Sequence, residues 1–298
     1  MIQLVDVTKR YDDTIVVDRL NLQIDPGEIV GLIGHNGAGK STTLKMIAGL
    51  VEPTSGRVQV MGHDMQRENI KVKARIGYLP EESSLYEAMT ARQYLLFFSE
   101  LYRMPRLKAL KRIDELLDSL GLAEKNKRSS PADKLTGEFS KGMKRKTAIA
   151  RTLLHDPDLL ILDEPSSGLD PLTSFFIINY LKTLRREGKT VILSAHNLFH
   201  LETICDRVGI IKNGKLLIFD NMDVIRSRLG RREYQILFHT DQKLDYERVN
   251  GNYVFRAGEV DAIARMLETV SANGWTLMDL SMRESALEEI YVKLMTNS

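Results

Sequence analysis

The sequence predicts an α/β fold built on a mostly parallel sheet, and three features indicate it. Residues 29–33 form a continuous apolar run that leads into a glycine-rich loop and then into a helix-like stretch. Residues 159–162 and 190–193 are similarly apolar, as expected of strands that are covered on both faces. A largely helical block, about residues 84–156, separates the first strand from the other two.

The N-terminal part predicts an antiparallel β subdomain beside this sheet. Residues 2–7 and 20–24 alternate apolar and polar side chains, which is typical of half-buried antiparallel strands. A turn signal at residues 25–28 precedes the first buried strand. Further strands are predicted at residues 57–61 and 75–79, where the second strand is closed by a proline.

The helical block predicts three amphipathic helices. Thr90 and Gln93 have the spacing of a capping box, so we expect the first helix to begin there. Apolar residues at helical spacing predict a second helix up to Gly121 and a third over about residues 141–154. The fold class is therefore α/β with an inserted helical subdomain.

The C-terminal part predicts a separate small domain. Residues 208–219 read as a β-hairpin with an Asn-Gly turn. The basic run at residues 226–232 is interpreted as a solvated linker rather than a lipid-facing patch. The predicted domains are thus residues 1–222 and an α+β domain of residues 223–298, in which no chemical motif is found.

Composition restricts the function classes. The chain has 298 residues and a net charge of +2, which is too balanced to indicate nucleic acid as a partner. Its single cysteine, Cys205, excludes an internal disulfide and fits a reducing compartment. Apolar stretches fall far short of the ~20 residues that a bilayer requires. We therefore expect a cytoplasmic protein whose membrane role, if any, depends on a partner.

The glycine-rich loop predicts a nucleoside triphosphate site. Gly34, Gly39, Lys40 and Ser41 match the pattern G-x-x-x-x-G-K-[ST] without a mismatch. Glycines let backbone N–H groups surround a phosphate, and the following helix adds its positive dipole end. Lys40 is expected to reach the β- and γ-phosphates, and Ser41 to ligate Mg²⁺. The predicted binding residues are Gly34, His35, Asn36, Gly37, Ala38, Gly39, Lys40, Ser41 and Thr42.

Two carboxylates follow the apolar run at residues 159–162. Asp163 occupies the position from which an acid anchors Mg²⁺ in proteins with this phosphate-binding loop. Glu164 lies where a general base could polarise an attacking water. A surface Asp-Glu pair is the alternative, and the buried strand before it together with the upstream loop disfavours that interpretation. Glu164 and Lys40 are therefore catalytic candidates.

A further motif decides the family. Phe139-Ser140-Lys141-Gly142-Met143 opens a helix about twenty residues before the carboxylate pair, and with the two other motifs it resembles the signature of the ATP-binding cassette (ABC) ATPases. In that family the signature usually reads Leu-Ser-Gly-Gly-Gln, so Lys141 and Met143 replace a glycine and a glutamine. The resemblance covers roughly residues 1–220.

The resemblance implies roles for four further positions. Asp170, in Ser167-Gly168-Leu169-Asp170, matches the family's D-loop and would contact a second subunit. His196 falls at the family's H-loop and would contact the γ-phosphate, which makes it a third catalytic candidate. Tyr11 matches the aromatic residue that stacks on adenine. Glu81 stands where the family usually has the Q-loop glutamine, and its carboxylate would hold Mg²⁺ through water.

The resemblance also implies partners. In the family two cassettes close head to tail around two ATP molecules, so Ser140 and Gly142 would complete the site of a second copy. The chain looks like the ATPase subunits of ABC-2-type exporters, whose permease is a separate membrane chain, and a peripheral place on the inner face of the plasma membrane follows. The alternatives are a soluble ABC ATPase acting on ribosomes or nucleic acid and a nucleotide sensor without turnover. We expect ATP and Mg²⁺ as ligands and no nucleic acid.

Overall fold

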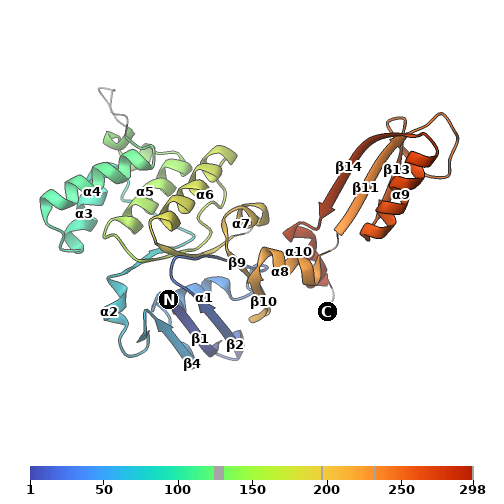
Figure 1. The fold of residues 1–298 in the computed structure, drawn as a ribbon. Coiled ribbons are helices and arrows are strands. Elements are labelled where there is room, and N and C mark those ends of the chain that lie inside the picture. The colour runs from blue at the N-terminus through green and yellow to red at the C-terminus, as the bar shows by residue number, and fades with distance from the viewer. Residues whose placement is uncertain (124–130, 196, 231, 297–298) are drawn as a thin grey trace. The chain divides into compact units, whose positions relative to one another are not determined.

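The computed structural model describes residues 1–123, 131–195, 197–230 and 232–296. It divides into two compact units, Met1–Asn221 and Met222–Ser298 (Figure 1). None of the helices within the described residues is long and apolar enough to span a bilayer. Both units combine helices with sheets, so the α/β fold class with an additional α+β unit is confirmed.

A six-stranded sheet forms the centre of the first unit. In sheet order its strands are β10 (Lys215–Asn221), β9 (Arg207–Lys212), β3 (Ile29–Ile33), β8 (Thr190–Ser194), β7 (Leu159–Leu162) and β6 (Ile76–Leu79). All neighbouring pairs are parallel except β10 and β9, which form the expected hairpin. Asn213 and Gly214 both have positive φ at its turn, as a two-residue turn of this kind requires.

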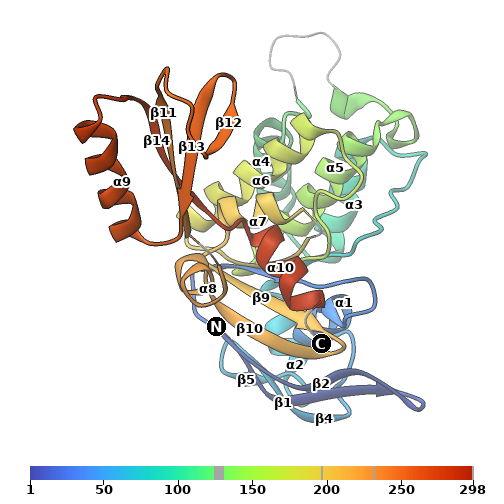
Figure 2. The ribbon, with the colours of Figure 1, turned by 90° about the vertical axis from the view of Figure 1, so that its right-hand side faces the viewer.

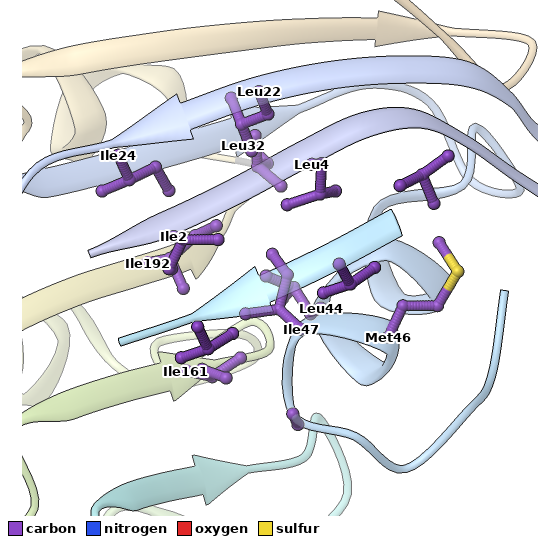
Figure 3. Packing of buried hydrophobic residues seen from close by; sticks show 14 of the residues in the cluster. Ile2, Leu4, Leu22, Ile24, Leu32, Leu44, Met46, Ile47, Ile161 and Ile192 are labelled. Carbon is purple, nitrogen blue, oxygen red and sulfur yellow. The ribbon is translucent and has the colours of Figure 1, made fainter. Parts of the chain in front are cut away.

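An antiparallel sheet packs beside the central one in the first unit. Its strands, in sheet order, are β2 (Thr14–Ile24), β1 (Ile2–Tyr11), β4 (Ser55–Val60) and β5 (His63–Asp64). The helix α1 (Lys40–Ile47) contributes Leu44 and Ile47 to the core that these strands share with the central sheet (Figure 3). Ile161 of β7 and Ile192 of β8 belong to the same core, which therefore ties the phosphate-loop helix to the strands of the site.

Helices gather on the other side of the central sheet (Figures 1 and 2). They are α3 (Ala91–Leu101), α4 (Arg106–Ser119), α5 (Lys141–Leu153) and α6 (Pro171–Arg186). The capping box is confirmed, because Gln93 N donates to Thr90 Oγ1 at 3.2 Å and Thr90 N donates to Gln93 Oε1 at 2.9 Å. Within the described residues of the first unit, three helices have no counterpart in the sequence-based prediction, namely α2 (Asn69–Lys73), α6 and α7 (Leu198–Ile204).

The second unit is a small α+β structure with its own core. Its sheet has the order β12 (Glu247–Val249), β13 (Asn252–Ala257), β11 (Arg232–His239) and β14 (Thr276–Glu284). The helix α9 (Val260–Ala272) packs on one face of this sheet (Figure 1). The buried residues between them are Ile236, Phe238, Tyr253, Ile263, Met266 and Val270.

The interpretation of residues 226–232 as a linker is wrong for most of that run. The helix α8 (Met222–Leu229) covers its first part, with Met222 and Ile225 buried. Arg226 and Arg228 lie in the last turn of α8, where positive charge favours a helix because of its dipole. The final helix α10 (Leu287–Thr296) contacts α8, so the run belongs to the packed structure of the second unit.

Candidate functional site

The candidate site lies where four neighbouring strands of the central sheet end. The strands β3, β8, β7 and β6 are parallel, so their carboxyl ends meet at one edge, where open α/β sheets bind ligands. The loop at residues 34–39 follows β3, and Asp163 and Glu164 follow β7. Glu81 follows β6 after one proline. Topology therefore brings together residues that are far apart in the sequence.

The phosphate loop needs its glycines for space and for backbone conformation. Gly37 and Gly39 have φ values of 79° and 105°, in the left-handed region that favours glycine. A Cβ atom at Gly39 would lie 2.6 Å from the carbonyl oxygen of Val16, and one at Gly34 would lie 2.4 Å from that of Ile211. These approaches exclude a side chain at either position without a shift of the backbone.

Lys40 is folded back under this loop. Its Nζ donates to the carbonyl oxygen of Gly34 at 2.6 Å and to that of His35 at 3.2 Å. Burial lowers the pKa of the ammonium, and the nearby carboxylates of Glu164, Asp163 and Glu81 oppose that shift. The side chain is therefore a buried cation at the mouth of a loop of backbone donors, which suits a phosphate ligand.

A chain of hydrogen bonds joins the loop helix to the carboxylate pair. Ser41 Oγ donates to Asp163 Oδ1 at 3.1 Å, and Ser194 Oγ of β8 donates to the same oxygen at 2.6 Å. Ser194 Oγ in turn accepts from the backbone N–H of Glu164 at 2.9 Å. Glu164 is buried and has a φ of 48°, a conformation that costs energy for a residue with a Cβ atom.

A cavity lies directly over these groups. Its lining residues are Val16, Asn36, Gly37, Ala38, Gly39, Lys40, Ser41, Thr42, Glu81 and Glu164. The cavity thus places the phosphate loop opposite the predicted general base. Gly34 and His35 are not part of this lining, and their carbonyl groups accept the hydrogen bonds of Lys40.

Of the predicted site residues that the structure describes, Gly34, His35, Asp163 and Tyr11 are not among those that line this cavity. Among the described residues that line it, Tyr11 is absent, and its ring lies at the end of β1 with 45% of its surface exposed. Val16, on the next strand β2, lines the wall instead. The role predicted for His196 concerns a position outside the described residues.

The cavity offers oxygen donors for a divalent cation. The Ser41 hydroxyl and the Asp163 carboxylate are in contact, and the Glu81 carboxylate lies on the wall. Such hard donors fit Mg²⁺, which takes few protein ligands and completes its shell with phosphate oxygens and water. Over the described parts of the chain, no group of three or more His, Cys, Asp or Glu residues could hold a metal alone.

The signature residues and Asp170 lie outside the lining of this cavity. Ser140 caps α5, because Met143 N donates to its Oγ at 3.2 Å. Asp170 is exposed and caps α6, accepting from Thr173 N at 2.9 Å, and hydrogen bonds from Thr173 lower its pKa. A Cβ atom at Gly142 would lie 3.0 Å from Thr173 Cγ2, so α5 and α6 are packed closely here.

One side chain at the site has no counterpart among the sequence-based predictions. Arg145 of α5 is 8% exposed and donates to carbonyl oxygens of the segments that carry Glu81 and Glu164. A signal was available, because Arg145 falls on the helix face that buries Gly142 and Ile149. A charged residue at such a core position is unusual unless its polar atoms find partners.

Comparison with known sequences gives consistent matches. A family model described as ABC transporter matches residues 17–167. The chain is 35% identical to the bacitracin transport ATP-binding protein BcrA of Bacillus licheniformis, over 99% of this chain and 97% of that protein. It is 33% identical to the linearmycin resistance ATP-binding protein LnrL of Bacillus subtilis, over 99% and 98%.

Solved structures agree with these matches. The structure described as the ATP-binding subunit of an ABC transporter has a TM-score of 0.68 and 32% identity, covering 76% of this chain and 92% of that one. A dimeric post-hydrolysis ATP-binding cassette bound to ADP and Pi has a TM-score of 0.67 and 29% identity, covering 74% and 99%. The two structures cover 76% and 74% of this chain, which corresponds in length to the first unit, Met1–Asn221.

Proposed function

This chain belongs to the ABC transporter family and is an ATP-binding ATPase, and we propose that it drives a permease carried on a separate membrane chain. The observation that carries the proposal is the convergence of Lys40, Ser41, Glu81 and Glu164 on one cavity at the edge of the central sheet. A phosphate loop alone would bind a nucleotide. A buried carboxylate facing that loop is what hydrolysis requires in addition.

The proposed chemistry assigns one task to each group of this cavity. The loop amides and Lys40 hold the β- and γ-phosphates and stabilise the charge that develops during transfer. Glu164 accepts the proton of the water whose oxygen attacks the γ-phosphorus, while the bond to ADP breaks. The left-handed backbone of Glu164 and its bond to Ser194 fix the position of this carboxylate.

Mg²⁺ is part of the proposal because the donor set fits it. Ser41 and Asp163 would hold the ion, with Glu81 acting through water. When bound, the ion supplies positive charge that offsets the charge of the phosphate oxygens. His196 is proposed as a γ-phosphate contact, and Tyr11 as the ring that stacks on adenine.

We further propose a head-to-tail dimer of two copies with ATP at the interface. The α5 N-terminus offers Ser140 and backbone N–H groups as a second phosphate site. Asp170 would contact the partner copy at the same interface. Dimeric cassettes among the similar structures support this arrangement. Closure with ATP and opening after hydrolysis would make the nucleotide a switch for a domain movement.

The names of the relatives favour a role in transport over one on ribosomes or nucleic acid. Two that match over nearly the whole chain are named for bacitracin transport and for linearmycin resistance. We therefore propose export, and a peripheral place on the inner membrane face through the permease. The small α+β unit, residues 223–298 in the predicted boundaries, is proposed as an accessory domain of such subunits.

The Glu164→Gln variant tests the proposal. The amide cannot accept a proton, so ATP hydrolysis should fall by at least about 10²-fold while ATP still binds. ATP should then hold two copies together, and the variant should elute as a dimer in size-exclusion chromatography with ATP and as a monomer without it.

Glu187→Gln is the matched control, because Glu187 is an exposed carboxylate at the end of α6. This control should hydrolyse ATP at the wild-type rate and should show no ATP-stabilised dimer. A Glu164→Gln protein that remains monomeric with ATP and turns over like the wild type would refute the assignment.

A further inference from the structure

Arg145 makes an unusually complete set of hydrogen bonds. Its guanidinium has five N–H donors and no acceptor. Nε donates to Pro165 O at 3.0 Å, Nη1 to Pro80 O at 2.8 Å and Glu81 O at 2.9 Å, and Nη2 to Asp163 O and Glu164 O at 2.8 Å each. Five donors are thus matched by five backbone carbonyl groups.

These carbonyl groups come from two loops that follow neighbouring strands. One loop follows β6 and carries Glu81, and the other follows β7 and carries Glu164. Both residues line the phosphate cavity. The Arg145 side chain is buried, so its bonds are made in a medium where they are strong and where losing them is costly.

The charge of Arg145 persists despite burial. Burial lowers the pKa of the guanidinium to about 10, and the attraction of Asp163, Glu81 and Glu164 opposes the shift. The group is therefore protonated at neutral pH, and all five donors are available. A lysine at this position would carry the same charge with three donors in a different geometry.

We infer that Arg145 is a positioning residue for ATP hydrolysis, through which the signature helix α5 fixes the backbone of Glu81 and Glu164. The strained φ of Glu164 supports this role, because such a conformation persists when surrounding bonds determine it. The five carbonyl groups that Arg145 holds belong to the two carboxylate loops and not to the phosphate loop. We therefore expect phosphate binding to survive a change at Arg145.

In the dimer, Arg145 would also connect the two ATP sites, a consequence that rests on the proposed function. Ser140 and Gly142 at the start of α5 would contact the ATP of the partner copy, while Arg145 of the same helix holds the carboxylate loops of its own site. A shift of α5 on closure would thus be passed to Glu164 of the same chain.

The test is Arg145→Lys, with Arg151→Lys as the matched control on the same helix. Arg151 bonds Tyr94 Oη at 2.9 Å and lies over the Phe98 ring, and it is not among the residues that line the cavity. For Arg145→Lys we expect kcat to fall about 10- to 100-fold, because Glu164 is displaced, with the dissociation constant for ATP unchanged. Arg151→Lys should leave both quantities at wild-type values.

Three measurements on the full chain distinguish a positioning role of Arg145 in hydrolysis from a role in stability alone. They are kcat, the ATP dissociation constant by calorimetry without Mg²⁺, and the thermal midpoint without nucleotide. A lower kcat with retained binding, at a temperature where the variant is folded, supports the inference. Wild-type kcat in Arg145→Lys overturns it, and so does an equal loss of kcat and binding. If Arg145→Lys does not fold, Arg145→Gln, which keeps two donors, is measured instead.

A failure of this inference is distinguishable from a failure of the proposed function. If Arg145→Lys keeps wild-type kcat while Glu164→Gln forms the ATP-stabilised dimer, the positioning role is wrong and the function stands. If Glu164→Gln neither loses turnover nor dimerises, the proposed function is wrong independently of Arg145.

Discussion

The two faces proposed to contact ATP differ in how far one chain completes them. At the base of the phosphate cavity, Ser41 and Ser194 both donate hydrogen bonds to Asp163, and the buried Lys40 donates to the carbonyl oxygen of Gly34. At the other face, the polar side chains of Ser140 and Asp170 are engaged as caps of their own helices. The first face is thus a cavity that fits a phosphate ligand, whereas the second consists of the capped N-termini of α5 and α6.

This difference indicates what each face contributes to ATP binding. A buried network keeps its geometry without a ligand, so a single chain can bind the triphosphate. A helix N-terminus with a capping side chain has donors ready for an anion but lacks surrounding groups. The proposed dimer supplies them, since the second face of one copy would close the cavity of the other.

The largest expected effect concerns the buried face. In Lys40→Ala the cation under the loop is removed, so ATP binding should weaken by at least about 10²-fold, as for loss of a phosphate clamp. Calorimetry with ATP checks this. Lys45→Ala, an exposed lysine on the same helix, is the control and should bind normally. Wild-type affinity in Lys40→Ala would remove the basis for distinguishing the two faces.

A smaller effect is expected at the helix-end face. In Ser140→Ala a hydroxyl that would contact the partner's ATP is lost, and a hydrogen bond to a charged group contributes about 1.5–3 kcal/mol. Steady-state hydrolysis should therefore fall about 10- to 100-fold, with ATP binding by the single chain unchanged.

The control for Ser140→Ala must account for the lost helix cap. Thr90→Ala removes a cap of the same kind from α3, and either substitution should cost about 1 kcal/mol of unfolding free energy. Thr90→Ala should nevertheless hydrolyse ATP like the wild type. Equal hydrolysis by the two variants would mean that Ser140 is a cap without a role in the partner's site.

The same division explains what could be predicted from the sequence. The phosphate loop and the carboxylate pair are local patterns, so the positions from Gly34 to Ser41 and Asp163 are recognisable from the sequence alone. Arg145 acts through carbonyl groups some 20 and 65 residues away, and backbone acceptors leave no pattern in a sequence. Ser194 was likewise hidden, because its role depends on the neighbouring strand β7.

The helices that were not predicted have a related cause. Asp170 and Pro171 form a strong start signal for α6, with the cap bond at 2.9 Å and proline in the first turn. Asp170 matches the family's D-loop and is predicted as a dimer contact, whereas in the single chain it caps α6. For residues 226–232, the density of arginine suggested solvent, whereas Met222 and Ile225 just before it bury one side of a helix.

The smallest effect is expected at Glu81, a residue of the phosphate cavity that Arg145 of α5 also contacts. Its carboxylate lines the cavity, but its backbone carbonyl is what Arg145 holds, and Glu81→Gln leaves that bond intact. The amide keeps an oxygen for a water-mediated contact, and exposed charge pairs contribute about 0–1 kcal/mol, so hydrolysis should stay within about fivefold of wild type. Steady-state ATPase assays check this, with Glu82→Gln as the control. An inactive Glu81→Gln would show that the carboxylate itself is needed, and the buried face would then extend beyond the loop and the strand that carries Glu164.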